Sequence, residues 1–138
     1  MKTKSKLKGV KPTKGKLLKE KEVVSIDAFQ HPVFCFKYIH QDFDLNHCTA
    51  DEKVALIEQI IRLSGMTWND IKLAPKHGLG SEKITISAIN AGLPEMLTED
   101  VDHLLALRFL GKAPFVGWRN KFIFHIFYID RGFTLYKH

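Results

Sequence analysis

Hydrophobic residues recur along this chain with two different periods, and the change of period divides the chain into two parts. Within residues 51–64 the apolar positions are three and four apart, as on one face of a helix: Val54, Ile57, Ile60 and Ile61. From residue 103 onward apolar and polar positions follow a period of two, which is typical of strands. The pattern therefore predicts helices first and a sheet after them.

The ends of the first helix are marked by capping residues. Thr49 and Glu52 have the spacing of a capping box, and Asp51 adds negative charge to the first turn. Gly65 stands where a left-handed residue commonly follows a helix. We therefore expect a helix over residues 51–64 that buries its apolar stripe.

A shorter helix and a first strand are predicted on either side of this helix. Thr67 is a second capping residue, with Trp68 and Ile71 expected to face inward and Pro75 to end the helix. Residues 31–39 are β-branched and aromatic, which predicts a strand.

The C-terminal third predicts a β-meander. Its strand-like segments are separated by short turns and cover residues 104–109, 115–119, 122–129 and 133–136. Connections this short join antiparallel neighbours. The expected fold class is α+β, with one or two N-terminal helices packed on a curved antiparallel sheet of about four to six strands. Residues 122–129 are apolar on both faces, which predicts a cover on both sides or a hydrophobic groove on one.

The positive charge of the chain is concentrated at its N-terminus. Residues 1–22 hold nine of the 21 Lys and Arg residues, all of them lysines, against two glutamates. The rest of the chain has 12 basic and 13 acidic residues. We expect a disordered Lys-rich tail over residues 1–22 and a single domain over residues 23–138. Such a tail would bind phosphates without reading sequence, or would act as a solubilising leader.

Composition narrows the class of protein. The two cysteines, Cys35 and Cys48, lack the spacing of a redox or metal motif and are expected as free thiols in a reducing compartment. No apolar run approaches the roughly 20 residues of a membrane span. The N-terminus lacks the apolar stretch of a secretory signal. We expect a bacterial cytoplasmic protein.

One candidate site is the Gly-rich segment of residues 76–83. Its glycines would let backbone amides approach a phosphate, with Lys76 and Lys83 beside it and His77 able to exchange a proton. The alternative is a plain connection between a helix and a strand.

A second candidate site is the last hairpin. Pairing of neighbouring strands would bring Arg108, Arg119 and Tyr136 near His125, with Lys121 at the turn. Such a cluster could hold a phosphate, move a proton and stack on a base. The alternative is that His125 is a core residue with a fixed partner.

Neither a metal site nor a cofactor site is predicted. None of the seven histidines lies three or four residues from another, and His47 directly precedes Cys48, which is poor ligand geometry. No phosphate-binding P-loop and no hydrolase nucleophile motif is present.

Two resemblances bear on function. The run Gly117-Trp118-Arg119, followed by residues 124–130 (FHIFYID), resembles the ending of a family of small uncharacterised bacterial proteins, for which we know no activity. Residues 68–71 (WNDI) and 76–80 (KHGLG) resemble an upstream part of that family. The layout is loosely similar to RelE/ParE-type toxins. That resemblance implies RNA cleavage on the ribosome without a metal, by Lys, Arg, His or Tyr side chains.

Three functional hypotheses follow. The leading one is a toxin-like, metal-independent endoribonuclease in which Arg108 and Arg119 hold phosphate, His125 or His77 moves the proton, and Tyr136 stacks or donates. In it the nucleic-acid-binding residues are Lys76, Lys83 and Lys121. The second is a non-catalytic binding module with a basic tether. The third is a small-molecule pocket between the sheet and helix 51–64. RNA or the ribosome, a cognate protein and a second copy of the chain are the partners considered.

Overall fold

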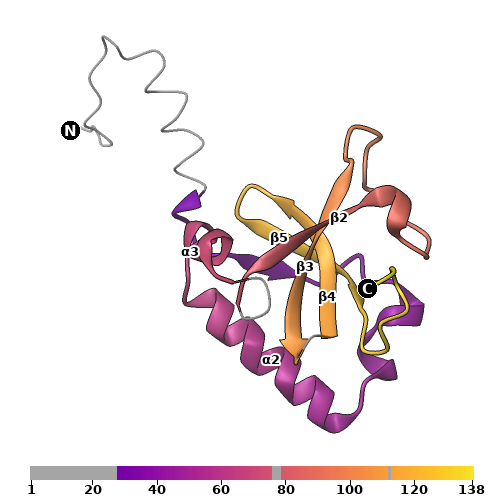
Figure 1. Cartoon of the computed structure of the whole chain (residues 1–138), viewed down its shortest axis with the longest axis horizontal. Helices are drawn as coiled ribbons and strands as arrows, with labels where there is room; N and C mark the ends of the chain where they lie inside the picture. Colours follow the sequence, from indigo (N-terminus) through magenta and orange to yellow (C-terminus); the bar gives the residue numbers. More distant parts are fainter. Residues whose placement is uncertain (1–27, 76–78, 112) are drawn as a thin grey trace, which may run out of the picture.

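The computed structural model describes residues 28–75, 79–111 and 113–138. In this part of the chain, the helices α2 (Ala50–Ser64) and α3 (Trp68–Leu73) lie against a five-stranded sheet (Figure 1). The strands are β1 (Val33–Cys35), β2 (Ser81–Thr85), β3 (His103–Leu110), β4 (Ala113–Asn120) and β5 (Ile123–Ile129). Within the described ranges, three short 3-10 turns cover Gln41–Phe43, Leu45–His47 and Ile86–Ala88.

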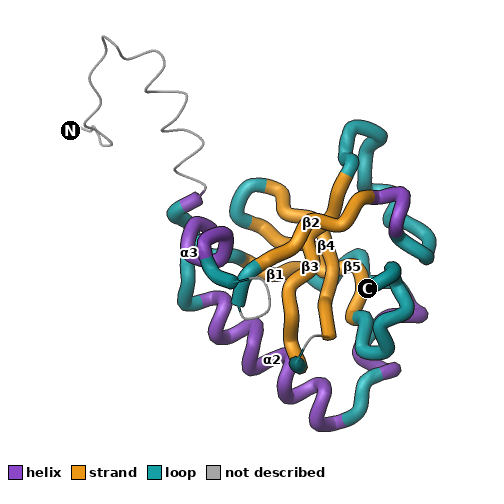
Figure 2. Tube along the Cα trace, viewed as in Figure 1, coloured by secondary structure: helices purple, strands orange, loops and turns teal. Residues whose placement is uncertain are grey.

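The α+β class is confirmed, and the sheet is mixed. Its strand order is β1-β5-β4-β3-β2, and β2 to β5 form an antiparallel meander. β1 joins the edge parallel to β5, with Val33 opposite Ile123. A parallel neighbour needs a long crossover, and the helices and the rest of the sheet lie between these strands in the chain (Figure 2).

The caps of both helices are as predicted. Thr49 and Glu52 exchange side-chain and backbone hydrogen bonds at the start of α2. Thr67 and Asp70 do the same at α3, whose Trp68 and Ile71 are buried. Two expectations for α2 were wrong. Of its predicted apolar stripe, Val54, Ile57 and Ile61 are exposed and only Ile60 packs partly against the core, and Gly65 is right-handed, with φ −85°. α2 packs instead through the opposite side, where Leu56, Gln59 and Leu63 are buried.

Some boundaries also differ from the prediction. Residues 133–136 are not a strand, because the Asp130 carboxylate accepts hydrogen bonds from the backbone N–H groups of Thr134 and Leu135. The first strand has three residues, shorter than the apolar run 31–39. Residues 81–83 belong to β2 and not to a loop.

The sheet is covered on both faces, each by a different part of the chain. On one face, the helix face, the core side chains Leu56, Leu63 and Ile71 of α2 and α3 pack on Phe115 and Phe124. The opposite face, the loop face, is covered by residues 36–43, 86–101 and the C-terminal segment. β5 is therefore buried on both sides by its own chain.

A bulge between Val116 and Gly117 changes the register of β4 against β5. A Cβ atom on Gly117 would lie 1.9 Å from the carbonyl oxygen of His125, so only glycine fits here. The missing side chain also leaves Leu105, which pairs with Gly117, without a side chain directly opposite it in β4.

Candidate functional site

A groove of about 620 Å³ opens at the end of the sheet beside α3. It is lined by α3, by β2, β3 and β4, and by the segment that precedes β3. Its charged and titratable lining residues are Lys72, Lys83, Asp100, Asp102, His103 and Arg119. Cations and an imidazole thus meet carboxylates in one concave site, as phosphate-binding and proton-transfer sites require.

Strand register explains why these side chains meet. Lys83 pairs with Leu105, and Leu105 pairs with Gly117. Because residues two apart in a strand share a face, Lys83, His103 and Arg119 all belong to the helix face. Lys83 is also the diagonal neighbour of His103 across β2 and β3, at a spacing of roughly 7–8 Å between backbones that long side chains can span.

Arg119 forms one wall of the groove by lying over an indole ring. Its guanidinium carbon is 4.4 Å from the centroid of the Trp68 ring, and its Nε donates to the Lys121 carbonyl at 2.6 Å. The indole is itself fixed, since its Nε1 donates to the Phe122 carbonyl at 2.9 Å. The cation is therefore held in place on a rigid aromatic support.

His103 and Asp102 form a pair at the start of β3. His103 Nδ1 lies 2.8 Å from Asp102 Oδ1. This hydrogen bond lowers the pKa of Asp102, and the charge of Lys83 lowers it further against the opposing effect of desolvation. An ionised Asp102 accepts the hydrogen of Nδ1, which leaves Nε2 of a neutral His103 as a proton acceptor.

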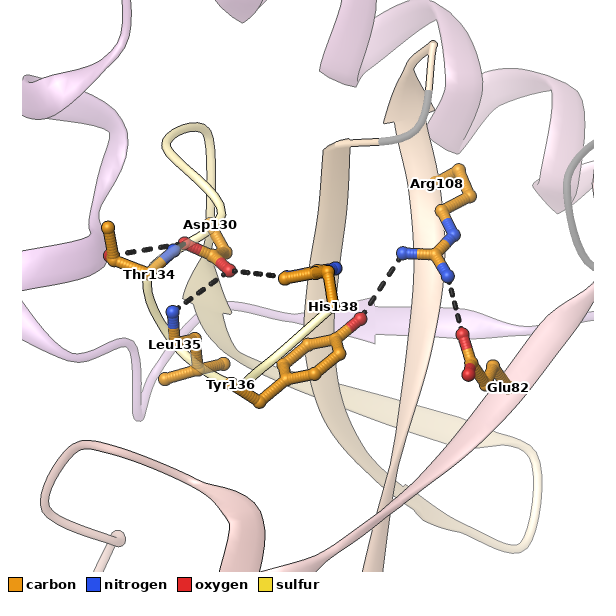
Figure 3. A network of polar contacts seen from close by, with 7 residues as sticks. All are labelled: Glu82, Arg108, Asp130, Thr134, Leu135, Tyr136 and His138. Carbon is orange, nitrogen blue, oxygen red and sulfur yellow. Dashed lines mark hydrogen bonds and ion pairs between the residues drawn. The ribbon is translucent and has the colours of Figure 1, made fainter.

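Two residues predicted for catalysis lie together, but on the loop face. Arg108 is 6% exposed, and its guanidinium contacts the Glu82 carboxylate at 2.5 Å and the Tyr136 hydroxyl at 3.2 Å (Figure 3). Burial raises the pKa of Tyr136, and hydrogen bonding to Arg108 opposes this shift. This network of Glu82, Arg108 and Tyr136, the loop-face clamp, joins β2, β3 and the C-terminal segment.

The same segment is held a second time at Asp130, which is 1% exposed. Its carboxylate accepts from the backbone N–H groups of Thr134 and Leu135 at 2.8 and 3.1 Å, and His138 Nε2 lies 3.5 Å away (Figure 3). The His138 ring stacks on Tyr136 at 4.1 Å between centroids. These contacts fix the end of the chain on the loop face.

His125 also faces the loop side and is separated from Arg119 by the sheet. Its ring is stacked on Trp118, with centroids 5.8 Å apart, and contacts Tyr38 at 5.9 Å. Its Nδ1 is buried without a hydrogen-bond partner, and desolvation lowers its pKa. The predicted cluster of Arg108, Arg119 and Tyr136 around His125 is therefore not formed, because Arg119 lies on the other face and Arg108 and Tyr136 contact each other instead.

The predicted lysines are divided between the groove and its surroundings. Lys83 lines the groove, whereas Lys121 is exposed at the β4–β5 turn with φ 60°. Lys76 and His77 lie outside the described residues, as does the tail 1–22.

Sequence reasoning missed Lys72, His103 and Asp102. The adjacent Asp102-His103 pair before an alternating strand could have indicated part of the site, because alternation puts His103 and Leu105 on one face. The groove itself depends on the Leu105–Gly117 pairing, which no local pattern shows.

Within residues 28–75, 79–111 and 113–138, no three His, Cys, Asp or Glu side chains come together as metal ligands would. Over the same ranges, no helix has the length and apolar character needed to cross a membrane.

Fold class alone does not determine activity, which depends on the residues of the site. Compared with known proteins, the chain matches no family model, no curated protein and no solved structure.

Proposed function

We propose that the protein is a metal-independent endoribonuclease that holds a single RNA strand in the groove beside α3. The observation that carries the proposal is the imidazole of His103, held by Asp102 on the same sheet face as Lys83 and Arg119. RNA can be cleaved by its own 2′-OH when a base removes the proton and cations stabilise the charged phosphorane.

The residues of the groove can be given roles in this reaction. Nε2 of His103 takes the proton of the 2′-OH, while Asp102 keeps the ring in the required tautomer. The 2′-oxygen then attacks the adjacent phosphorus, the bond to the 5′-oxygen breaks, and a 2′,3′-cyclic phosphate remains. Lys83 and Arg119 stabilise the negative charge, and the departing 5′-oxygen takes a proton from Lys72 or water.

The direct test is cleavage of a short fluorescent RNA by the full chain in the presence of EDTA. We expect fragments ending in 2′,3′-cyclic phosphate, no cleavage of the same strand made of DNA, and a loss of at least roughly a hundredfold in rate for His103→Gln. His125→Gln, whose ring lies on the other face, is the matched control and should retain activity. Cleavage by both variants at the wild-type rate would contradict the proposal.

A second function is favoured by the exposure of the pair. The side chains of His103 and Asp102 are 40% and 89% exposed, and charges in contact with water act more weakly on a reaction than buried ones. RNA that binds in the groove without being cleaved would identify a non-catalytic binding module. One assay distinguishes the endoribonuclease from the binding module. Both functions predict weaker RNA binding by Lys83→Gln, and only the endoribonuclease predicts cleaved RNA.

If the endoribonuclease is toxin-like, its activity should stop bacterial growth. Induction of the wild-type chain should arrest bacterial growth, and induction of a folded His103→Gln variant should not. Normal growth in both cultures, together with cleavage in vitro, would leave a ribonuclease without toxin activity.

A further inference from the structure

α2 carries a second apolar stripe that the sheet does not cover. Val54, Ile57 and Ile61 are 56%, 45% and 66% exposed, although they are spaced three and four residues apart on one side of the helix. The side chains that α2 buries against the sheet include Leu56 and Leu63. The helix is therefore apolar on two sides and packed on one.

The two sides face in opposite directions. At 100° per residue, Leu56 and Leu63 lie on average almost half a turn away from the centre of the exposed stripe. Figure 1 shows α2 along the margin of the molecule with the strands on one side of it. A partner helix placed on the stripe would thus have the body of the protein behind α2 and not in its way.

Local helix stability does not account for the stripe. Its three members are β-branched, and such residues form helices less readily than Leu, Ala or Lys. Exposed positions that serve the helix alone favour the latter residues. Val and Ile are well suited to contact between helices, where stiff side chains pack closely.

The charges beside the stripe indicate what covers it. With Val54 and Ile61 at position a of a heptad and Ile57 at position d, Lys53 falls at g and Glu58 at e. Both charged side chains are exposed. In a parallel pair of α2 helices, position g of each copy faces position e of the other, so Lys53 meets Glu58 twice. In an antiparallel pair, e faces e and Glu58 would meet carboxylates.

We propose that the protein forms a parallel, two-fold symmetric dimer through α2, with the stripe of Val54, Ile57 and Ile61 at its centre. Lys53 of each copy pairs with Glu58 of the other. The contact is short, so the dimer dissociates on dilution.

Sedimentation of the full chain over a range of concentrations tests the dimer. The wild type should approach twice the 15.8 kDa of one chain as its concentration rises to about 0.5 mM. The double variant Ile57→Lys/Ile61→Glu keeps the net charge, and it should remain monomeric with an unchanged circular dichroism spectrum because both side chains are exposed. A wild type that stays monomeric, or a dimer that this variant does not weaken, would overturn the proposal.

Charge variants test the parallel register. Lys53→Glu and Glu58→Lys should each weaken self-association by roughly fivefold, because each creates two like-charge contacts. The two variants mixed together should associate as well as the wild type, since every contact is then attractive. Lys37→Glu, an exposed position in the segment that covers the loop face, is the matched control and should leave self-association unchanged. A wild-type level of association by Lys53→Glu would overturn the parallel arrangement.

Discussion

Arg108 and Arg119 are the same residue type on neighbouring strands, yet they lie on opposite faces of one sheet. Arg108 is 6% exposed on the loop face and contacts Glu82 and Tyr136. Arg119 lies on the helix face, over the Trp68 ring and at the wall of a groove. One arginine ties three parts of the chain together, and the other lines a space that a ligand can enter.

The same contrast separates His125 from His103. The ring of His125 is stacked on Trp118, and its Nδ1 is buried without a partner. The ring of His103 has a carboxylate on one nitrogen and lines the groove. Residue type therefore does not assign a role here, because the face of the strand and the layer that covers it decide whether a side chain can reach a substrate.

The largest expected effect that separates the two faces is on stability. Arg108→Met leaves the buried end of the clamp without its cation and should lower the free energy of unfolding by about 2–4 kcal/mol. Arg119→Met, on the partly exposed groove wall, should cost less than about 1 kcal/mol. Urea unfolding of both variants measures this difference, and equal losses would contradict the contrast.

A similar difference is expected between two aspartates. Asp130→Asn replaces a buried carboxylate that accepts two backbone N–H groups, and should cost about 2 kcal/mol in thermal or urea unfolding. Asp100→Asn, at the exposed rim of the groove, should stay within about 0.5 kcal/mol of the wild type. If both substitutions were neutral, the Asp130 carboxylate would not stabilise the C-terminal segment as described.

Affinity for RNA should depend on the charged residues of the groove. Lys83→Gln and Arg119→Gln should each weaken RNA binding by roughly fivefold to tenfold at about 0.1 M salt, because each removes one phosphate contact. Asp100→Asn removes a repulsive charge from the rim and should strengthen binding slightly. Fluorescence anisotropy with a short labelled strand measures all three. An unchanged affinity in both cation variants would place the binding surface elsewhere.

The smallest expected effect is a pH dependence of stability that arises on the loop face. Desolvation lowers the pKa of His125 from 6.5, so the unfolded chain binds this proton more readily than the folded protein does. Stability should therefore fall as the pH drops below 6.5, towards the lowered pKa of the folded state. His125→Phe should flatten the urea midpoint over this range. A variant with the wild-type dependence would show that another group is responsible.

The sequence predicted the parts of this structure that short-range rules govern. The capping boxes at Thr49 and Thr67 depend on residues three apart, and the meander depends on turns of a few residues. The burial of α2 was predicted on the wrong side because Val54, Ile57 and Ile61 form the more apolar stripe. Periodicity shows that a helix face is apolar, but it does not show what that face contacts.

The groove could not have been predicted in the same way. It depends on the pairing of Leu105 with Gly117 and on the position of α3, and both are contacts between distant parts of the chain. Arg119 and Lys83 were predicted as site residues and both line the groove, although Arg119 was grouped with His125 and Arg108 across the sheet. The error arose because neighbouring strands were considered without assigning their faces.

The central claim is that a ligand meets the helix face and not the loop face. Titration of the isotope-labelled full chain with a short single-stranded RNA, followed by NMR, tests this claim at named groups. The Nε–H signals of Arg119 and of the Trp68 indole should shift progressively, while the Nε–H signal of Arg108 stays in place. Movement of the Arg108 signal, with those of Arg119 and Trp68 unchanged, would contradict the account.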